Sequence, residues 1–416
     1  MKKYYIITYG CQMNKSDSER IASVLEKIGF KSASDIKEVD LILVNMCSVR
    51  QSAVDRVYGL IPKFKKLKTK NSKLKTILTG CILKEDKKKF TKNFDLILNI
   101  KNLPNWPKYL NLTKTFHLKP KTYLRIQPKY KNNFSAFIPI SNGCNNFCSY
   151  CVVPYVRGSL ICRPYQEILK EAKNVIEKGF KEIWFLGQNV NDYKSKVVNF
   201  AKLLKMVNDI RGDFWIRFTS PHPNDFSDEL IETIAQCQKV TPYLNLPVQS
   251  GDNIILKRMN RLYKIEYYKN LVKKIRSAFK KYRQGLEKEI AISTDIIVGF
   301  PGETKKQFEN TLGLFKEIKF DMAYIAKYSP RPGTAASNLK DDVLPEEKER
   351  RYKILTEILK KTALSKNKKC IGREIEILPE EQKNGFLRGK SRHYKTVKFE
   401  SDQSLIGQFV NIKIIN

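Results

Sequence analysis

The amino-acid sequence predicts an α/β protein with an N-terminal doubly wound parallel sheet, a central open (β/α)6 barrel and a small C-terminal β-barrel. Two patterns indicate this fold class. Short apolar runs alternate with helical stretches up to about residue 120, and the same alternation restarts at about residue 130. From about Cys370 onward, short β-like runs separated by Gly replace it. A length of 416 residues fits two or three domains of roughly 150 residues each.

In the N-terminal part, strands and helices follow one another in the order of a doubly wound sheet. Asp40–Val44 is a continuous apolar run, the pattern of a strand buried on both faces. Ser16-Asp17-Ser18-Glu19 matches a capping box, which predicts a helix from there through Ile28. A second helix is expected at about Val49–Phe64. The expected strands are Lys3–Thr8, Asp40–Val44, Lys75–Thr79 and one near Asp95–Ile100.

A connector with Pro and Lys, at about Leu103–Pro128, precedes six further strand–helix repeats. Helices are expected at Gln166–Lys178, which Gly179 follows, and at Lys305–Lys316. Six consecutive repeats fit a partial or open (β/α) barrel. Its expected strands are Ala136–Ile140, Glu182–Leu186, Phe214–Phe218, Tyr243–Leu246, Ala291–Val298 and Met322–Lys327. The β-like runs of the tail are Glu374–Leu378, Thr396–Phe399 and Phe409–Ile415.

The net charge of the chain indicates the kind of partner that it binds, and the length of its apolar runs indicates whether it enters a membrane. Lys and Arg total 78 against 42 Asp and Glu, a formal net charge of +36. This excess favours a polyanionic partner, because each phosphate contact releases counterions, although a lysine-rich proteome would produce the same excess. No apolar run approaches the ~18 residues that cross a bilayer, and the run after Lys3 is too short for a signal peptide. We therefore expect a cytoplasmic protein with no membrane segment.

The strongest motif is a Cys-x-x-x-Cys-x-x-Cys array of Cys144, Cys148 and Cys151, directly after a predicted strand. The chain has nine cysteines and no export signal, which favours metal binding, redox use or burial over disulfides. Three thiolates can each bind one iron of a cubane cluster and leave the fourth iron open for a substrate or cofactor. Ferredoxin arrays have another spacing and a fourth Cys, and structural zinc generally has four protein ligands.

Three other cysteines, Cys11, Cys47 and Cys81, each follow a strand of the first sheet. The carboxyl ends of parallel strands lie along one edge, so the three thiols can converge there and bind a second cluster. Small apolar residues in strand–helix turns would produce the same pattern, and geometry alone leaves both interpretations open. The remaining cysteines fit no spacing pattern, and we expect them to be buried: Cys162, Cys237 and Cys370.

Two Gly-containing segments, Gly187–Asn191 and Gly299–Glu303, follow strands of the predicted barrel. They lie at the carboxyl edge, where (β/α) enzymes carry their chemistry. Glycine lets backbone amides approach an adenine or a carboxylate closely, although bare turns would look the same. His222 follows another strand, and an orienting or structural role is favoured for it over a metal or acid–base role.

At these residues the chain resembles the radical S-adenosylmethionine methylthiotransferase family, over essentially its full length. The matching blocks are Tyr9–Asn14, Asn45–Arg50, Gly80-Cys81, Gly143–Tyr155, Gly187–Asn191, Leu246–Gly251, Gly299–Glu303 and Tyr328–Thr334. Within the family, Gly10–Asn14 and Gly187–Asn191 are most similar to members that act on dimethylallyladenosine in tRNA.

The resemblance implies an N-terminal methylthiotransferase domain at 1–118, a radical core at 130–366 and an RNA-binding TRAM module at 369–416. It also implies two 4Fe–4S clusters. The radical cluster, with S-adenosylmethionine on its open iron, would be bound by Cys144, Cys148 and Cys151. The auxiliary cluster would be bound by Cys11, Cys47 and Cys81. The implied S-adenosylmethionine contacts are Gly187, Gln188, Asn189, Gln249, Gly299 and Glu303.

The implied reaction adds a methylthio group to C2 of dimethylallyl (isopentenyl) adenosine next to the anticodon in tRNA. Sulfur would come from the auxiliary cluster and the methyl group from a second S-adenosylmethionine. The implied partners are the tRNA anticodon loop and an electron donor such as flavodoxin or ferredoxin, and we expect a monomer. A sister enzyme acting on threonylcarbamoyladenosine or on a ribosomal protein aspartate stays open. So does a different class, a non-catalytic iron–sulfur RNA-binding sensor.

Three positions depart from the wording of the family. Cys162 stands where a serine usually precedes Arg163-Pro164, which places an extra thiol near the site. Ser220-Pro221-His222-Pro223 differs from the usual Thr-Ser-His-Pro. The chain stops at Asn416, so we expect a short last strand in the C-terminal module.

Overall fold

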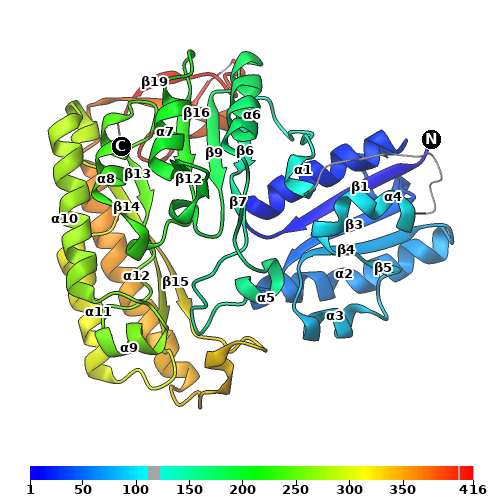
Figure 1. Cartoon of the computed structure of the whole chain (residues 1–416), viewed down its shortest axis with the longest axis horizontal. Coiled ribbons are helices and arrows are strands. Elements are labelled where there is room, and N and C mark those ends of the chain that lie inside the picture. The colour runs from blue at the N-terminus through cyan, green and yellow to red at the C-terminus, as the bar shows by residue number, and fades with distance from the viewer. Residues whose placement is uncertain (111–121, 402, 416) are drawn as a thin grey trace. The chain divides into compact units, whose positions relative to one another are not determined.

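A computed structural model describes residues 1–110, 122–401 and 403–415 (Figure 1). Residues 111–121 of the expected connector, and with them the expected domain boundary at residue 118, lie outside the described residues. The chain divides into two compact units. The first unit contains Met1–Asn132, Asn142–Asn145 and Cys151–Arg163, and the second contains Asn133–Ser141, Asn146–Tyr150 and Pro164–Asn416.

The first unit is built on a five-stranded parallel sheet with the strand order β2-β1-β3-β4-β5. Every residue of β3 is buried, which confirms the strand predicted from its continuous apolar run. Leu41 and Leu43 of this strand pack into one core cluster, and Ile42 and Val44 into another. The strands are β1 at Lys3–Tyr9, β2 at Lys31–Ser32, β3 at Leu41–Cys47, β4 at Lys75–Cys81 and β5 at Leu96–Ile97.

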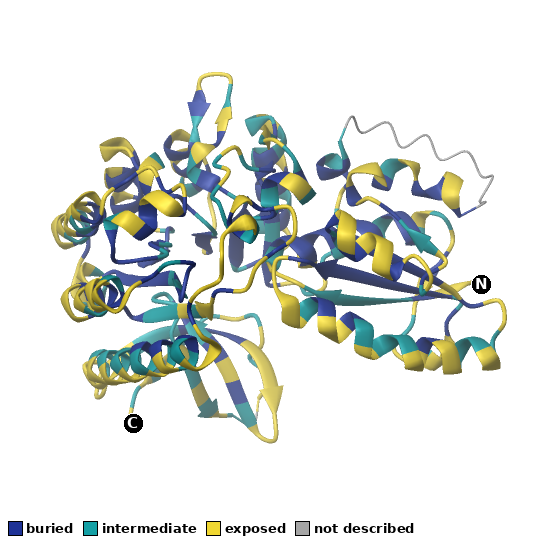
Figure 2. Cartoon of the chain, turned by 90° about the horizontal axis from the view of Figure 1, so that it is seen from below, coloured by how far each residue is buried: buried dark blue, intermediate teal, exposed yellow. Residues whose placement is uncertain are grey.

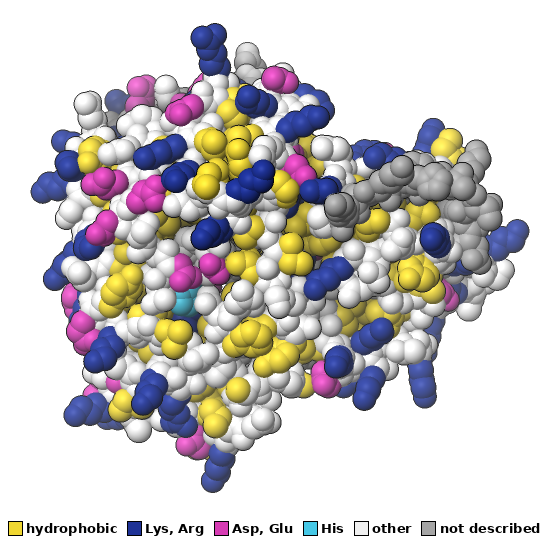
Figure 3. All heavy atoms as spheres, in the orientation of Figure 1, with side chains coloured by type: hydrophobic (Ala, Val, Ile, Leu, Met, Phe, Trp, Pro, Cys, Tyr) yellow, Lys and Arg dark blue, Asp and Glu magenta, His cyan; other side chains and the backbone are white. Residues whose placement is uncertain are grey.

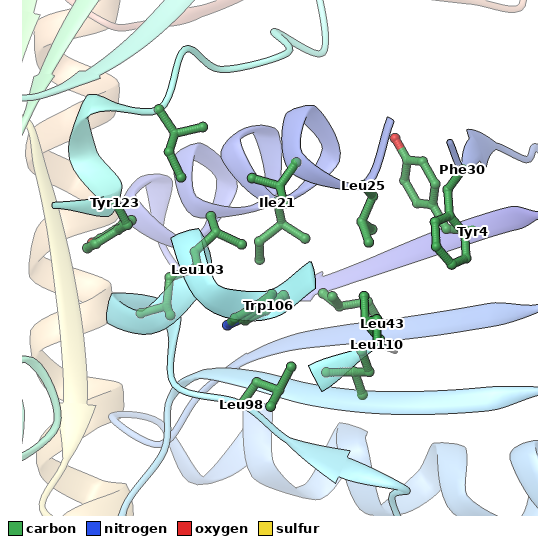
Figure 4. Packing of buried hydrophobic residues seen from close by; sticks show 14 of the residues in the cluster. Tyr4, Ile21, Leu25, Phe30, Leu43, Leu98, Leu103, Trp106, Leu110 and Tyr123 are labelled. Carbon is green, nitrogen blue, oxygen red and sulfur yellow. The ribbon is translucent and has the colours of Figure 1, made fainter. Parts of the chain in front are cut away.

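Helices cover both faces of this sheet. The helix α1 (Gln12–Lys27) packs against one face together with Trp106 and Tyr123, as Figure 4 shows. The helices α2 (Gln51–Lys70) and α3 (Lys84–Phe90) pack against the other face. A parallel sheet enclosed in this way buries its strands on both sides, which explains their unbroken apolar sequences.

The predicted start of α1 is wrong. The helix begins at Gln12, and Cys11 is its N-cap residue without a side-chain capping bond. Ser16 lies inside the helix, where its hydroxyl accepts a hydrogen bond from Arg20 at 2.6 Å. The chain enters the helix as soon as it leaves β1, so the edge of the sheet, and not a capping side chain, sets the start. The second helix also extends beyond its expected end at Phe64, to Lys70.

The second unit contains six parallel strands, here called the six-strand core, in two sheets of order β12-β9-β6 and β13-β14-β15. A parallel bridge between Ile216 of β12 and Val240 leads from the first sheet towards β13. All six strands predicted from the sequence are present, within a few residues. They are β6 at Ser135–Pro139, β9 at Glu182–Leu186, β12 at Trp215–Phe218, β13 at Tyr243–Asn245, β14 at Ala291–Val298 and β15 at Met322–Lys327.

Long helices follow the core strands, and Figure 2 shows that they turn exposed faces to solvent. They are α6 at Tyr165–Glu177, α7 at Phe200–Asn208, α8 at Asp228–Gln236, α10 at Ile265–Tyr282, α11 at Lys305–Ile318 and α12 at Pro345–Lys368. The short elements are α4 at Trp106–Tyr109, α5 at Val153–Arg157, α9 at Asn253–Arg258, β7 at Ser141–Asn142, β8 at Ile161–Cys162, β10 at Lys194–Ser195 and β11 at Val198–Asn199.

The C-terminal residues form a four-stranded antiparallel sheet with the order β18-β17-β16-β19. The strand β17 was not predicted, because Gly389 interrupts its apolar alternation. The last strand has four residues, all within the expected run Phe409–Ile415. The strands are β16 at Glu374–Lys383, β17 at Phe386–Ser391, β18 at Thr396–Glu400 and β19 at Val410–Lys413.

The turn between β17 and β18 contacts the six-strand core. Arg217 of β12 donates to two backbone carbonyls of this turn, at 2.8 and 3.0 Å. The ring of Tyr394 in the turn stacks on Tyr243 with centroids 4.6 Å apart. The same ring meets Trp184 edge to face at 5.4 Å. The C-terminal sheet is therefore attached to the core through aromatic and charge-assisted contacts.

Candidate functional site

Three cysteines of the first unit lie at the carboxyl edge of neighbouring strands. Cys47 is the last residue of β3 and Cys81 the last of β4, and the parallel register pairs them directly. Cys11 follows β1, the other neighbour of β3. The Cys11 side chain reaches the surface, but the protein atoms packed around its sulfur raise its pKa, and the proximity of Cys81 raises this pKa further. The structure therefore brings the three thiols together at one edge.

A buried pair of asparagines joins the segments that carry these cysteines. Asn14 Nδ2 donates to Asn45 Oδ1 at 2.9 Å, and Asn45 Nδ2 donates to the Asn14 carbonyl at 2.8 Å. The thiol of Cys11 donates to Asn14 Oδ1 at 3.4 Å. Because Asn45 lies two residues before Cys47, the asparagine pair fixes the position of Cys11 relative to Cys47.

Glycines precede Cys11 and Cys81 because the asparagine pair leaves no room for a side chain there. A Cβ atom on Gly80 would lie 2.2 Å from the Met46 carbonyl oxygen and 2.5 Å from Asn45 Oδ1. The φ of Gly80 is +109°, which strains any L residue. A Cβ atom on Gly10 would lie 2.4 Å from Asn14 Oδ1.

We expect Gly80→Ala to lower the free energy of unfolding by about 2–5 kcal/mol, from overpacking and backbone strain together. Thermal unfolding of the purified protein measures the loss. Gly59→Ala is the matched control, because Gly59 lies within α2 and, among the described residues, only its own chain neighbours and helix backbone lie near its Cβ position. That control should gain about 0.5–1 kcal/mol. Equal melting temperatures for the two variants would show that the contacts around Gly80 are not tight.

The surroundings of Cys81 favour its thiolate. A hydrogen bond from Cys47 lowers the pKa of Cys81, against the opposing effect of burial. The same hydrogen bond raises the pKa of Cys47. The guanidinium of Arg157, with Nε 2.9 Å from Cys81 Sγ, lowers the pKa of Cys81 further. Metals bind the thiolate and not the thiol, so the edge favours the metal-binding form of Cys81, one of the three predicted ligands.

The array Cys144, Cys148 and Cys151 lies in the loop between β7 and α5. The amide of Cys144 donates to the Gly158 carbonyl at 3.1 Å. The amide of Val153 donates to Cys151 Sγ at 3.5 Å. The sequence places all three thiols in this one loop, as a cluster with one open iron needs.

The thiol of Cys148 has a cationic neighbour that the sequence did not reveal. Nη1 of Arg261 donates to Cys148 Sγ at 3.6 Å. Nη2 donates to the Pro247 carbonyl at 2.7 Å, and Nε to Tyr263 Oη at 3.1 Å. Arg261 is 7% exposed, so these bonds form away from solvent. Arg261 therefore holds the sulfur of Cys148 through a hydrogen bond from a buried cation.

The residues expected to contact S-adenosylmethionine all follow core strands, namely Gly187, Gln188 and Asn189 after β9, Gln249 after β13, and Gly299 and Glu303 after β14. Gln249 has a φ of +72°, and Ser220 after β12 has a φ of +54°. Such conformations cost about 1–3 kcal/mol in a residue other than Gly and cluster at functional sites. The edge thus carries backbone strain where the sequence predicts ligand binding.

The Glu303 side chain already has protein partners. Its Oε2 accepts from the Gly299 amide at 2.6 Å and from Arg351 at 2.7 Å. A Cβ atom on Gly299 would lie 2.3 Å from Cγ of Lys348. These contacts hold the turn after β14 against α12. A ligand contact through Glu303 therefore stays a prediction.

Three buried polar atoms at this edge have no hydrogen-bond partner, namely Ser141 Oγ, Asn189 Oδ1 and His222 Nε2. They follow β6, β9 and β12, which are neighbours in one sheet. Nδ1 of His222 accepts from the Asn224 amide at 3.3 Å, and burial lowers the pKa of His222 to about 3. The neutral ring therefore carries its proton on Nε2 and offers a donor. A ligand with amino, carboxylate, hydroxyl and adenine groups, such as S-adenosylmethionine, would satisfy these atoms.

The other cysteines differ in exposure. Cys237 is buried, as predicted, whereas Cys162 and Cys370 are partly exposed, so the prediction of burial is wrong for these two. Among the described residues, no group of three or more His, Cys, Asp or Glu is arranged around a single metal ion. A cubane cluster does not need such a group, because each thiolate binds a different iron.

A three-cysteine loop after the first of six parallel strands defines the class of radical S-adenosylmethionine proteins. Residues 138–315 match the model of the Radical SAM superfamily, and residues 3–99 match Uncharacterized protein family UPF0004. The solved radical S-adenosylmethionine methyltransferase TsrM from Kitasatospora setae has a similar fold, with a TM-score of 0.53 and 13% identity. That alignment covers 81% of this chain and 75% of the other.

Among curated proteins, tRNA-2-methylthio-N(6)-dimethylallyladenosine synthase from Clostridium botulinum (strain Langeland) is 42% identical over 436 positions. The alignment covers 99% of this chain and 94% of the relative. The synthase of the same name from Thermoanaerobacter pseudethanolicus is 40% identical, with 99% and 90% covered. The chain belongs to the family of these synthases, which confirms the resemblance indicated by its cysteine motifs.

Proposed function

We propose that this protein is a radical S-adenosylmethionine transferase that adds a methylthio group to C2 of dimethylallyladenosine next to the anticodon in tRNA. The proposal rests on two separate sets of three cysteines in a chain that aligns over 99% of its length with synthases named for this product. One set would serve the radical chemistry and the other the transfer of sulfur. Both sets would therefore contribute to the carbon–sulfur bond, while the methyl group of the sulfur–methyl bond would come from a second S-adenosylmethionine.

The finer architecture is part of this proposal. We infer that the six-strand core is an open (β/α)6 barrel, because Val240 continues the strand order from β12 towards β13. The C-terminal antiparallel sheet would be the TRAM module that binds RNA. The corresponding domains are residues 1–118, 130–366 and 369–416.

The cysteines would bind the two clusters in separate roles. Cys144, Cys148 and Cys151 would bind a 4Fe–4S cluster together with S-adenosylmethionine, and Cys11, Cys47 and Cys81 an auxiliary 4Fe–4S cluster. When bound, these groups supply the electron, the carbon radical, the sulfur and the methyl group. The chain itself orients them and excludes water.

The carboxyl edge of the six-strand core would bind S-adenosylmethionine through its unpaired polar atoms and its glycine turns. We expect His222→Asn to raise the KM for S-adenosylmethionine by about tenfold, because one hydrogen bond is lost. Asparagine is a good N-cap residue, so it keeps the capping of Asn224 while losing the Nε2 donor. The measurement is the rate of 5′-deoxyadenosine release against S-adenosylmethionine concentration. An unchanged KM would exclude His222 from the site.

The proposed partner is the anticodon loop of tRNA, and the net charge of +36 supports a polyanion. On the face seen in Figure 3, Lys and Arg side chains are scattered among acidic ones, so phosphate contacts would be distributed. In the described part of the chain, no helix has the length and apolar character to span a membrane. A cytoplasmic monomer that receives electrons from a flavodoxin or ferredoxin completes the proposal.

The decisive experiment uses anaerobically reconstituted protein with reductant, S-adenosylmethionine and tRNA that carries dimethylallyladenosine. Mass spectrometry follows 5′-deoxyadenosine and the methylthio nucleoside, and we expect both. Release of 5′-deoxyadenosine without the methylthio nucleoside would contradict dimethylallyladenosine as the substrate. Threonylcarbamoyladenosine tRNA and the ribosomal protein aspartate would then be assayed as substrates. The absence of both products from protein with two intact clusters would favour the iron–sulfur sensor.

A further inference from the structure

Arg157, the last residue of α5, lies among buried partners that all belong to the first unit. Its Nε donates to Cys81 Sγ at 2.9 Å, and its Nη2 donates to Asp17 Oδ2 at 2.7 Å. Its Nη1 donates to Tyr123 Oη at 3.1 Å and to Asn142 Oδ1 at 3.2 Å. Arg157 is 2% exposed, so its charge is balanced by these partners and not by water.

The geometry fixes where the Nε–H group points. A guanidinium is planar, and its donors have fixed directions. The bonds of Nη2 to Asp17 and of Nη1 to Tyr123 and Asn142 fix the orientation of this plane, and in that orientation Nε–H points to Cys81 Sγ. Asp17 forms the ion pair with Arg157, so the bond from Nε to the Cys81 sulfur is an addition to that pair.

We propose that Arg157 is a positioning residue of the auxiliary cluster, which holds the Cys81 thiolate through an N–H···S hydrogen bond and makes the cluster easier to reduce. This inference rests on the proposed function, because it requires a cluster at Cys11, Cys47 and Cys81. Hydrogen bonds to cluster sulfurs help to set the reduction potential. A cationic donor stabilises the reduced state more than the oxidised state, because the reduced cluster carries more negative charge.

Arg157 lies close in the sequence to Cys151, a proposed ligand of the radical cluster. The helix α5 begins at Val153, two residues after Cys151. One short segment therefore supplies a proposed ligand of the radical cluster and a hydrogen bond to a proposed ligand of the auxiliary cluster. Arg157 and Cys81 are 76 residues apart in the sequence, so no sequence motif predicts this contact.

The test compares reduction potentials in full-length protein whose radical cysteines Cys144, Cys148 and Cys151 are all replaced by Ala, so that only the auxiliary cluster is observed. Arg157→Met with Asp17→Asn removes one cation and one anion, which leaves the net charge unchanged while the bond to sulfur is lost. We expect its midpoint potential to fall by at least ~59 mV, a tenfold change for a one-electron couple. Asp17→Asn alone keeps the Nε–H donor, and its potential should stay equal or rise.

Redox titration followed by electron paramagnetic resonance measures the potentials, and iron content with circular dichroism checks the cluster and the fold. No cluster in the protein with intact Arg157 would overturn the auxiliary site itself. A normal cluster with an unchanged potential in the double variant would overturn this inference alone. If the double variant binds no cluster, Arg157→Lys decides: a lowered potential supports the directed N–H bond, and an unchanged one contradicts it.

Discussion

Replacing Cys148 with Ala should reduce the release of 5′-deoxyadenosine to the level seen without protein. The proposed radical cluster takes three thiolates from one loop, one for each of three irons. Cys148 is also the thiol that accepts the hydrogen bond from the buried Arg261, so its loss removes a ligand and leaves that cation without its sulfur partner. The measurement is anaerobic cleavage of S-adenosylmethionine by the reconstituted variant.

Cys370→Ala is the matched control, because Cys370 lies in the same unit and is partly exposed, outside both cysteine sets. We expect it to cleave S-adenosylmethionine at the unaltered rate. Cleavage of S-adenosylmethionine at the normal rate by the Cys148 variant would contradict the assignment of the radical cluster to this loop. Loss of cleavage in both variants would indicate general damage and not loss of a ligand.

Replacing Cys47 with Ala should separate the two halves of the reaction. We expect cleavage of S-adenosylmethionine to continue close to its normal rate while the methylthio nucleoside disappears. The reason is that Cys47, with Cys81 beside it in the register, belongs to the sheet edge and not to the Cys144–Cys151 loop. The measurement is both products from one incubation with tRNA.

Cys162→Ser tests the specificity of that result. Cys162 belongs to the same unit as Cys47, and serine is the residue that the family resemblance leads us to expect at this position. We expect this variant to make both products at normal levels. Continued methylthiolation by the Cys47 variant would refute the auxiliary role of the sheet edge.

The strands were predictable because a strand that is buried on both faces needs consecutive apolar residues, as in β3. The proximity of Cys47 and Cys81 was predictable from these strands, since the carboxyl ends of parallel strands lie at one edge of the sheet. The start of α1 was not predictable in this way. Its N-cap residue Cys11 provides no capping bond, while the box-like Ser16–Glu19 lies inside the helix.

The residues around the thiols were harder to predict because they act across long sequence separations. Arg261 lies 113 residues from Cys148, and no spacing rule links a lone arginine to a distant cysteine. The role of the Asn14–Asn45 pair was hidden for the same reason, although both residues lie within family blocks. The one local signal was the glycine before each of Cys11 and Cys81, which marks a close approach of backbone and side chain.

The attachment of the C-terminal sheet affects how truncated proteins should be interpreted. Deleting residues 369–416 would expose the aromatic faces of Trp184 and Tyr243 that Tyr394 covers. Failure of a shortened chain to modify tRNA is therefore not evidence that the C-terminal sheet binds RNA, because the deletion also removes packing from the six-strand core. Arg388 and Lys398 are exposed and opposite each other on β17 and β18, away from that attachment. On the RNA-binding role proposed for this sheet, charge reversal at these two positions should lower the affinity for tRNA and leave the Tyr394 contacts in place, which a deletion cannot do.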